Sequence, residues 1–310
     1  MSSRQRRTQA LPGYPQLLVN QSVRAASSSV SFIELRNGLR MPYVQAGEGE
    51  LLLFVHGSLC DYRYWQPQLA GLSKHYRCVA VSLTHYWPAA NTDTEPGLPF
   101  SWSEHANEVA EFIERFGVGP AHVVGHSRGG CVAFHSARRH PEHVRTLTLA
   151  DPGGPLQIAG RPPASLPEPV NALRARAAQL IESGEVEAGL QLFVDSVSRP
   201  GFWAMSTPGF RRMATDNAHT LARQFRDPLP AYVPEQAAEV RCPVLLIDGE
   251  KSPEMFHRTV AALQNWLPDA RRETVRGASH GMNLAHPSAF NRYVDEFIRS
   301  VSGQQAQQAQ

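Results

Sequence analysis

The 310-residue sequence contains only four cysteines, and none of them forms a Cys-x-x-Cys pair: Cys60, Cys78, Cys131 and Cys242. Cysteines spaced in this way are typical of small buried side chains in a reducing compartment, and they argue against a disulfide framework or a zinc site. Apolar runs of the roughly 18 residues that a membrane-spanning helix needs are also missing. We therefore expect a cytoplasmic protein with no membrane span, no metal and no other cofactor.

Charge of one sign is equally scarce. The 30 Lys and Arg residues nearly balance the 28 Asp and Glu residues, which leaves a formal net charge of +2. Such a chain lacks the excess of positive charge that is typical of nucleic-acid-binding proteins. Apolar residues make up 42% of the sequence, which is too many for a disordered chain. We expect a folded protein whose partner is a small molecule, and the sequence leaves its oligomeric state open.

Strand and helix patterns alternate along most of the chain. Leu51–Val55 (LLLFV) is a continuous apolar run, as expected of a strand buried on both faces of a parallel sheet. Similar short apolar runs at 78–83, 144–150 and 244–247 are separated by amphipathic helical patterns. This alternation predicts an α/β fold with a doubly wound, mostly parallel sheet.

The alternation stops between residues 152 and 240, where proline-separated helical patterns replace it and no convincing strand occurs. We expect this segment to form an all-helical cap, inserted into an α/β core that comprises residues 31–151 and 241–301. The polar segments 1–30 and 302–310 are predicted to be disordered tails.

The strongest chemical signal is the segment Gly125–Gly129 (GHSRG), which lies between a predicted strand and a predicted helix. In that context a Gly-x-Ser-x-Gly pattern is typical of a nucleophile elbow, a strained turn that exposes the serine hydroxyl. The glycines on either side let helix and strand approach without side-chain clashes. We therefore predict that Ser127 is a nucleophile.

A second signal, His56-Gly57-Ser58, follows the LLLFV strand. A glycine at this place lets backbone N–H groups face a substrate oxygen. The predicted oxyanion-hole donors are the backbone N–H groups of Ser58 and of Arg128, with Leu59 as a further candidate. The side chain of His56 is expected to anchor the loop through hydrogen bonds and to take no part in catalysis.

The third signal is Gly277-Ala278-Ser279-His280-Gly281-Met282, a small-residue loop between the last strand and the last helix. A serine hydroxyl needs an adjacent imidazole base to become nucleophilic at neutral pH. His280 is the predicted base, and His126 is the weaker candidate.

Together the three segments resemble the α/β-hydrolase fold family over about residues 31–300. The resemblance implies that nucleophile precedes histidine along the chain, as it does here, and that residues 152–240 correspond to the family's cap. Because the nucleophile position holds serine, the chain resembles the esterase-like branch. Epoxide hydrolases and haloalkane dehalogenases of the same family carry aspartate at that position.

In this family a carboxylate completes a catalytic triad with the serine and the histidine. The position of that acid departs from the family pattern in this chain. A carboxylate is expected in the turn after the strand at 244–247, but that position holds Ser252. Asp151, at the end of an earlier strand, is our predicted acid, because some relatives supply their acid from there. Glu250 and Glu254 flank the usual position and are the alternatives.

These residues predict a serine hydrolase that cleaves a small or medium carboxylic ester, lactone or thioester through an acyl-enzyme. A carbon–carbon bond hydrolase or a cofactor-free perhydrolase would use the same triad. The serine at position 252 also leaves open a ligand-binding protein with little turnover. Three apolar residues of the cap, Phe202, Trp203 and Met205, are predicted to line the substrate pocket.

Overall fold

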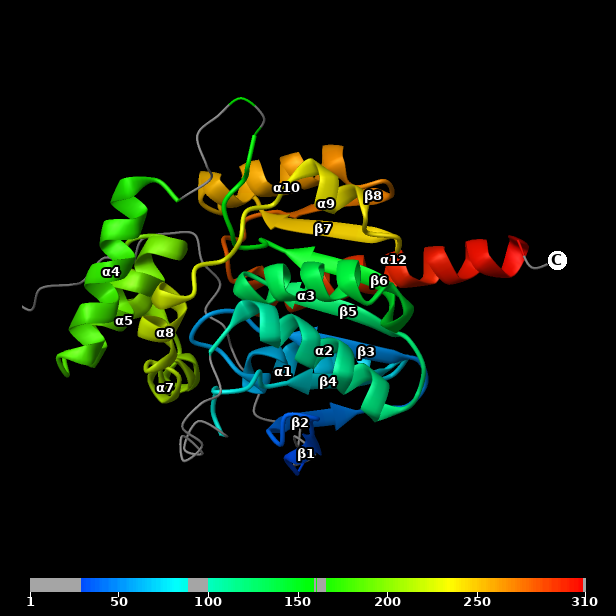
Figure 1. The fold of residues 1–310 in the computed structure, drawn as a ribbon, viewed down its shortest axis with the longest axis horizontal. Helices are drawn as coiled ribbons and strands as arrows, with labels where there is room; N and C mark the ends of the chain where they lie inside the picture. The colour runs from blue at the N-terminus through cyan, green and yellow to red at the C-terminus, as the bar shows by residue number, and fades with distance from the viewer. Residues whose placement is uncertain (1–28, 89–99, 159, 161–165, 309–310) are drawn as a thin grey trace, which may run out of the picture.

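The computed structural model describes residues 29–88, 100–158, 160 and 166–308, and within them one eight-stranded sheet forms the centre of the molecule (Figure 1). Its strands are β1 (Ser31–Glu34), β2 (Arg40–Ala46), β3 (Leu51–Val55), β4 (Arg77–Val81), β5 (Ala121–His126), β6 (Val144–Ala150), β7 (Val244–Gly249) and β8 (Ala270–Val275). The order across the sheet is β1-β2-β4-β3-β5-β6-β7-β8. Strand β2 runs antiparallel to β1 and β4, and all pairs from β4 to β8 are parallel. The predicted mostly parallel α/β sheet is confirmed.

Helices cover both faces of this sheet. One face carries α2 (Trp102–Phe116), α3 (Arg128–Arg139), α9 (Pro234–Ala238) and α10 (Glu254–Trp266). The other face carries η1 (Tyr62–Trp65), α1 (Gln66–Leu72), α11 (Met282–Ala285) and α12 (Pro287–Gln308). Alternate residues of β3 enter the two apolar clusters: Leu53 lies in one and Phe54 in the other. Burial on both faces is therefore the reason why this strand is apolar throughout.

The inserted helices pack on one another beside the sheet, at the left of Figure 1. They are α4 (Glu168–Glu182), α5 (Val186–Val197), α6 (Phe202–Met205), α7 (Pro208–Asp216) and α8 (Thr220–Arg226). An apolar cluster that includes Ala177, Leu190 and Leu221 holds them together. The predicted cap boundary at residue 240 needs correction, because Tyr232, Ala237 and Val240 already belong to the core cluster.

The two predicted tails differ in outcome. Residues 1–28 lie outside the described residues, whereas α12 continues to Gln308 where a disordered tail from residue 302 was expected. Its first turns are anchored by Phe290 and Val294 in the core. Once a helix is nucleated in this way, an Ala- and Gln-rich segment extends it at little cost. In the described part of the chain, no helix is both long and apolar enough to span a bilayer.

Candidate active site

Ser127 lies in a sharp turn between β5 and α3, with φ 55° and ψ −123°. A positive φ is strained for a residue with a side chain, and such strain is typical of functional turns. A Cβ atom at Gly129 would overlap the carbonyl oxygen of His56, and one at Gly125 would lie 2.8 Å from the Cβ atom of Ala133. Both glycines are therefore needed for the close approach of strand, turn and helix, as the sequence pattern predicts.

His280 follows β8 and lies beside this turn. His126, the residue before Ser127, donates from Nε2 to the backbone carbonyl oxygen of His280 at 2.7 Å. The two rings are 4.5 Å apart between centroids, and the Phe256 ring stacks on the His280 ring at 4.1 Å. The imidazole of His280 thus packs against two rings next to the elbow.

Asp151 follows β6 and reaches the same imidazole. Its Oδ2 atom lies 3.0 Å from His280 Nδ1, and both side chains are buried. The aspartate has φ 40°, a second strained residue close to Ser127. With the Nδ1 proton directed at a carboxylate, the neutral imidazole presents Nε2 as its acceptor. Asp151 therefore occupies the place that a triad acid requires relative to His280.

The serine that replaces the expected acid takes part in the same network. Ser252 donates its hydroxyl proton to Oδ2 of Asp151 at 2.6 Å. Glu250 instead accepts the backbone N–H of Gly277 at 2.7 Å, and Glu254 is exposed in the first turn of α10. Among the described residues, the carboxylate hydrogen-bonded to His280 thus comes from Asp151 and from neither glutamate.

Burial pushes both partners of this pair toward their neutral forms. It raises the pKa of Asp151 to about 7, and the hydrogen bond from Ser252 opposes that rise. It lowers the pKa of His280 to about 3, with a further lowering by the positive charge of Arg174. Among the described residues, Asp151 is the acidic side chain that contacts the imidazole of His280.

The loop after β3 packs directly against the elbow. A Cβ atom at Gly57 would lie 2.8 Å from the Cβ atom of Ser127, so a side chain here would displace the nucleophile. The next residue, Ser58, directs its hydroxyl away to Gln224 Oε1 at 2.6 Å. Arg128 is the first residue of α3, and its N–H therefore has no partner within the helix. The predicted oxyanion donors Ser58 and Arg128 line the same cavity as Ser127; their role and that of Leu59 stay predictions.

His56 fixes this loop from behind. Its Nε2 atom accepts the backbone N–H of Leu83 at 3.0 Å, and its Nδ1 donates to the carbonyl oxygen of Gly57 at 2.9 Å. Burial lowers the pKa of His56 to about 4, so the ring stays neutral and keeps this arrangement near neutral pH. Its contacts agree with the anchoring role expected of it.

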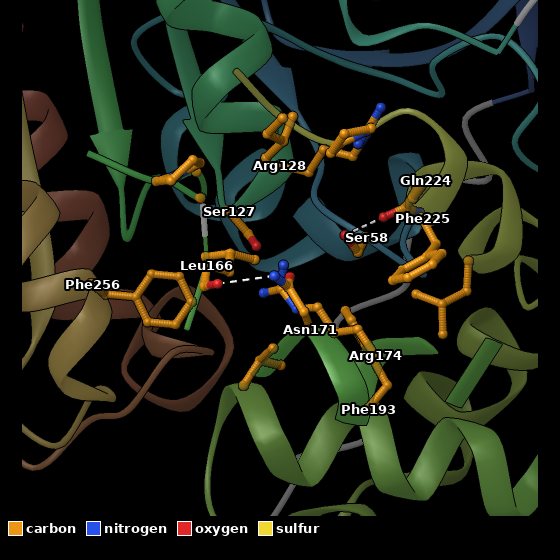
Figure 2. Close-up of a pocket in the computed structure, with 17 residues that line it drawn as sticks. Ser58, Ser127, Arg128, Leu166, Asn171, Arg174, Phe193, Gln224, Phe225 and Phe256 are labelled. Carbon is orange, nitrogen blue, oxygen red and sulfur yellow. Dashed lines mark hydrogen bonds between the residues drawn. The ribbon is translucent and has the colours of Figure 1, made fainter. Parts of the chain in front are cut away.

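A cavity of about 360 Å³ lies between the elbow and the cap (Figure 2). Ser58, Ser127 and Arg128 line its core side. Its apolar lining includes Phe193, Val197, Leu221, Phe225, Leu229 and Phe256. Its size is that of a pocket for a small organic molecule.

The predicted pocket residues of the cap do not line this cavity in the described part of the chain. Trp203 is 4% exposed and belongs to the apolar cluster inside the cap, and Phe202 packs against that cluster. Met205 is 59% exposed. The apolar pattern of residues 202–210 thus serves packing within the cap, whereas Phe193 and Leu221 of other helices face the substrate space.

Sequence reasoning missed three residues that shape the site: Phe256, His126 as a support for His280, and Arg174. The position of His126 beside the nucleophile was the only available signal for its role. Phe256 and Arg174 stand in ordinary helical patterns, and only the tertiary arrangement brings them to the pocket. Within the described residues, no group of three His, Cys, Asp or Glu side chains is placed to hold a metal ion.

Comparison with known proteins agrees with this geometry. Residues 52–293 match the model of the alpha/beta hydrolase family. The chain is 26% identical to a 2-(acetamidomethylene)succinate hydrolase of Mesorhizobium japonicum, over 82% of this chain and 90% of the relative. It is 24% identical to the uncharacterised carboxylesterase nap of Bacillus subtilis, over 81% of this chain and 80% of the relative.

A thermophilic esterase from Thermogutta terrifontis, solved with malate bound, has the same fold. Its TM-score is 0.71 at 19% identity, over 88% of this chain and 99% of the esterase. The match to the family model covers most of the sequence, including the elbow, the loop after β3 and His280. The chain therefore belongs to the alpha/beta hydrolase family and is a hydrolase of that fold.

Proposed function

We propose that the protein hydrolyses a carboxylic ester through an acyl-enzyme intermediate, with Ser127 as nucleophile, His280 as general base and Asp151 as the residue that orients the imidazole. The observation that carries the proposal is the 3.0 Å contact between Asp151 Oδ2 and His280 Nδ1 beside the strained serine turn. A buried carboxylate at Nδ1 directs the basic Nε2 atom outward, which is what activation of a serine hydroxyl needs.

In the first step, Ser127 Oγ attacks the ester carbonyl carbon while His280 Nε2 takes the hydroxyl proton. The carbonyl oxygen becomes an oxyanion, and the backbone N–H groups of Ser58 and Arg128 stabilise it. The positive end of the α3 dipole acts in the same direction. Collapse of the tetrahedral intermediate breaks the bond to the alcohol oxygen, which receives the proton from His280.

In the second step, a water molecule gives a proton to His280 and attacks the acyl carbon. The bond to Ser127 Oγ then breaks, the serine recovers its proton from the imidazole, and the carboxylic acid leaves. Throughout, Asp151 stabilises each transient imidazolium, which burial would otherwise make unfavourable. The contact of Asp151 with His280 also supports an enzyme over a ligand-binding protein, since that alternative relied on the serine at position 252.

The comparisons support an ester as substrate, because the relatives and structural neighbours include proteins described as carboxylesterases and esterases. The cavity of about 360 Å³ supports a substrate of small or medium size. Its apolar lining from the cap, which includes Phe193 and Leu221, supports an apolar acyl or alcohol group on the substrate.

Labelling with a fluorophosphonate probe tests the proposal, because such probes react rapidly only with an activated serine. We expect the wild-type protein to label, with the adduct mapped by mass spectrometry to the peptide that contains Ser127. Ser127→Ala should abolish labelling, whereas Ser58→Ala should still label, since the proposed donor at residue 58 is the backbone N–H. A folded wild-type protein that does not label, or an adduct at another serine, would overturn the assignment.

A further inference from the structure

Arg174 of α4 lines the cavity without a counter-ion. Within the described residues, its Nε atom is buried and has no hydrogen-bond partner, and no acidic side chain forms an ion pair with its guanidinium group. Its nearest favourable contact is the ring of Phe193, whose centroid is 5.9 Å away, at the outer limit for a cation–π interaction. Burial lowers the pKa of Arg174 to about 10, which leaves the group positively charged at neutral pH.

Two partly buried arginines close to the site are neutralised by acidic side chains. Arg128, which lines the same cavity, donates to Asp227 Oδ2 at 2.8 Å. Arg63, below the cap, donates to Asp61 at 2.6 Å and to Asp216 at 2.8 Å. Charges that lose contact with water are normally paired in this way. Unlike these two arginines, Arg174 has no acidic partner among the described residues, and its side chain lines the cavity in front of Ser127.

The rest of the cavity offers nothing to balance that charge. Its described lining contains no aspartate or glutamate and two arginines, of which Arg128 is already paired. Asn171, one turn before Arg174, uses its amide N–H for the carbonyl oxygen of Leu166 at 2.9 Å. Figure 2 shows both side chains extending from the cap helix into the space in front of Ser127. Among the described residues, the cavity lining therefore carries one positive charge that no acidic side chain neutralises.

We propose that Arg174 binds a carboxylate of the substrate, so that the substrate class is an ester that also bears a free carboxylate. The inference rests on the proposed ester hydrolysis and narrows it. Guanidinium matches a carboxylate in shape and charge and can donate two parallel hydrogen bonds. A neutral ester would leave the guanidinium of Arg174 without an anionic partner in the cavity.

The same pairing would favour catalysis at His280. The charge of Arg174 lowers the pKa of that imidazole and so opposes its protonation during attack. A bound carboxylate neutralises the arginine and removes this opposition. Substrates with a carboxylate would therefore bind more tightly and also meet a more basic catalytic histidine.

The test compares two esters of equal acyl length, monoethyl glutarate and ethyl pentanoate, by ethanol release. We expect wild-type kcat/KM to be about 10- to 100-fold higher for monoethyl glutarate, the gain typical of a charge-assisted hydrogen-bonded pair. Arg174→Gln should reduce the ratio of the two kcat/KM values by the same factor. Because the ratio is taken within one protein, loss of folded enzyme does not affect it.

Arg176→Gln is the matched control, because Arg176 lies on the same helix but is exposed and contacts Gln179. It should leave the substrate ratio at the wild-type value. A preference of the wild type for ethyl pentanoate, or a ratio that Arg174→Gln leaves within threefold of the wild type, would overturn the proposal.

Binding separates this inference from the hydrolytic proposal. Calorimetry with monoethyl glutarate should give at least about 10-fold tighter binding to Ser127→Ala than to Ser127→Ala/Arg174→Gln. If neither ester is hydrolysed but this difference in binding is found, ester hydrolysis is wrong and the carboxylate site stands. If esters are hydrolysed and the two variants bind monoethyl glutarate equally, ester hydrolysis stands and the carboxylate site is wrong.

Discussion

The core and the cap contribute to one cavity in different ways. On the core side, the site is built from turns at the ends of β3, β5 and β6, where backbone approaches backbone so closely that Gly57 and Gly129 leave no room for a side chain. On the cap side, amphipathic helices α4, α5 and α8 present side chains across the cavity. In the proposed mechanism, the core places the reacting atoms, and the cap places groups that meet the rest of the substrate.

This difference explains why the two sides should respond differently to mutation. A change in the core alters the position or protonation of a reacting group, so its effect falls on turnover of every substrate. A change in the cap alters which substrate is favoured and leaves the reacting groups in place. Substitutions in the core and in the cap should therefore differ in which kinetic quantity they change.

The largest effect is expected for Asp151→Asn in the core. An amide cannot stabilise the imidazolium and favours the wrong orientation of His280, so kcat should fall on the order of 10⁴-fold for every ester. Steady-state kinetics measures this loss, and circular dichroism checks that the variant is folded. Glu250→Gln is the control and should cost less than about tenfold, because Glu250 contacts the backbone of Gly277 and not the imidazole. Near-normal turnover of Asp151→Asn would refute the assigned acid.

Two glycines at equivalent helix positions compare the packing of core and cap. Gly129 is the second residue of α3 and Gly209 the second residue of α7. A Cβ atom at Gly129 would overlap backbone, whereas one at Gly209 would meet nothing within 4 Å. Gly129→Ala should lower the free energy of unfolding by about 3 kcal/mol, and Gly209→Ala should raise it by about 0.5 kcal/mol. Denaturant unfolding measures both; equal effects would mean that the two sides are not built differently.

The same contrast governs what could be predicted from the sequence. The elbow, the loop after β3 and the loop of His280 are readable because close backbone approach admits few residues, and glycine marks those positions. Asp151 could be named only as one of three acids, since the choice depends on which strand end faces His280. The predicted pocket residues of the cap are absent from the described lining of this cavity. Phe202 and Phe193 occur in similar helical patterns, and only the packing of helices decides which one faces the cavity.

Ser252→Ala tests whether the hydrogen bond from Ser252 keeps Asp151 ionised. Ser252 donates to Asp151 and lowers the pKa of that carboxyl group, so its removal should raise the pKa of Asp151 further. The carboxylate then becomes protonated at higher pH, and the fall of kcat on acidification should begin at higher pH than in the wild type. At neutral pH we expect kcat to fall about tenfold, as for a lost hydrogen bond to a charged group. An unchanged pH profile would contradict this role of the serine.

The double variant Asp151→Asn/Ser252→Asp moves the carboxylate to the position that the family pattern favours. If the oxygen at residue 252 can reach His280 Nδ1, kcat should recover about 100-fold relative to Asp151→Asn alone. Ser252→Asn in the same background is the matched control and should give no recovery. Equal activity of the two double variants would show that the turn after β7 cannot place an acid at the imidazole.

The smallest effect tests whether a charge in the cap changes the pKa of the histidine in the core. Arg174 lowers the pKa of His280 from across the cavity, so Arg174→Gln should raise that pKa. Asp151 and His280 form one hydrogen-bonded pair, and loss of a nearby positive charge makes protonation of that pair easier. The acid limb of kcat/KM for ethyl pentanoate should therefore move to higher pH by about half a unit. Arg174→Lys keeps the charge and should keep the wild-type limb. A limb that moves equally in both variants would mean that the arginine acts through its shape, and the division between a catalytic core and a cap that only selects substrates would then hold without exception.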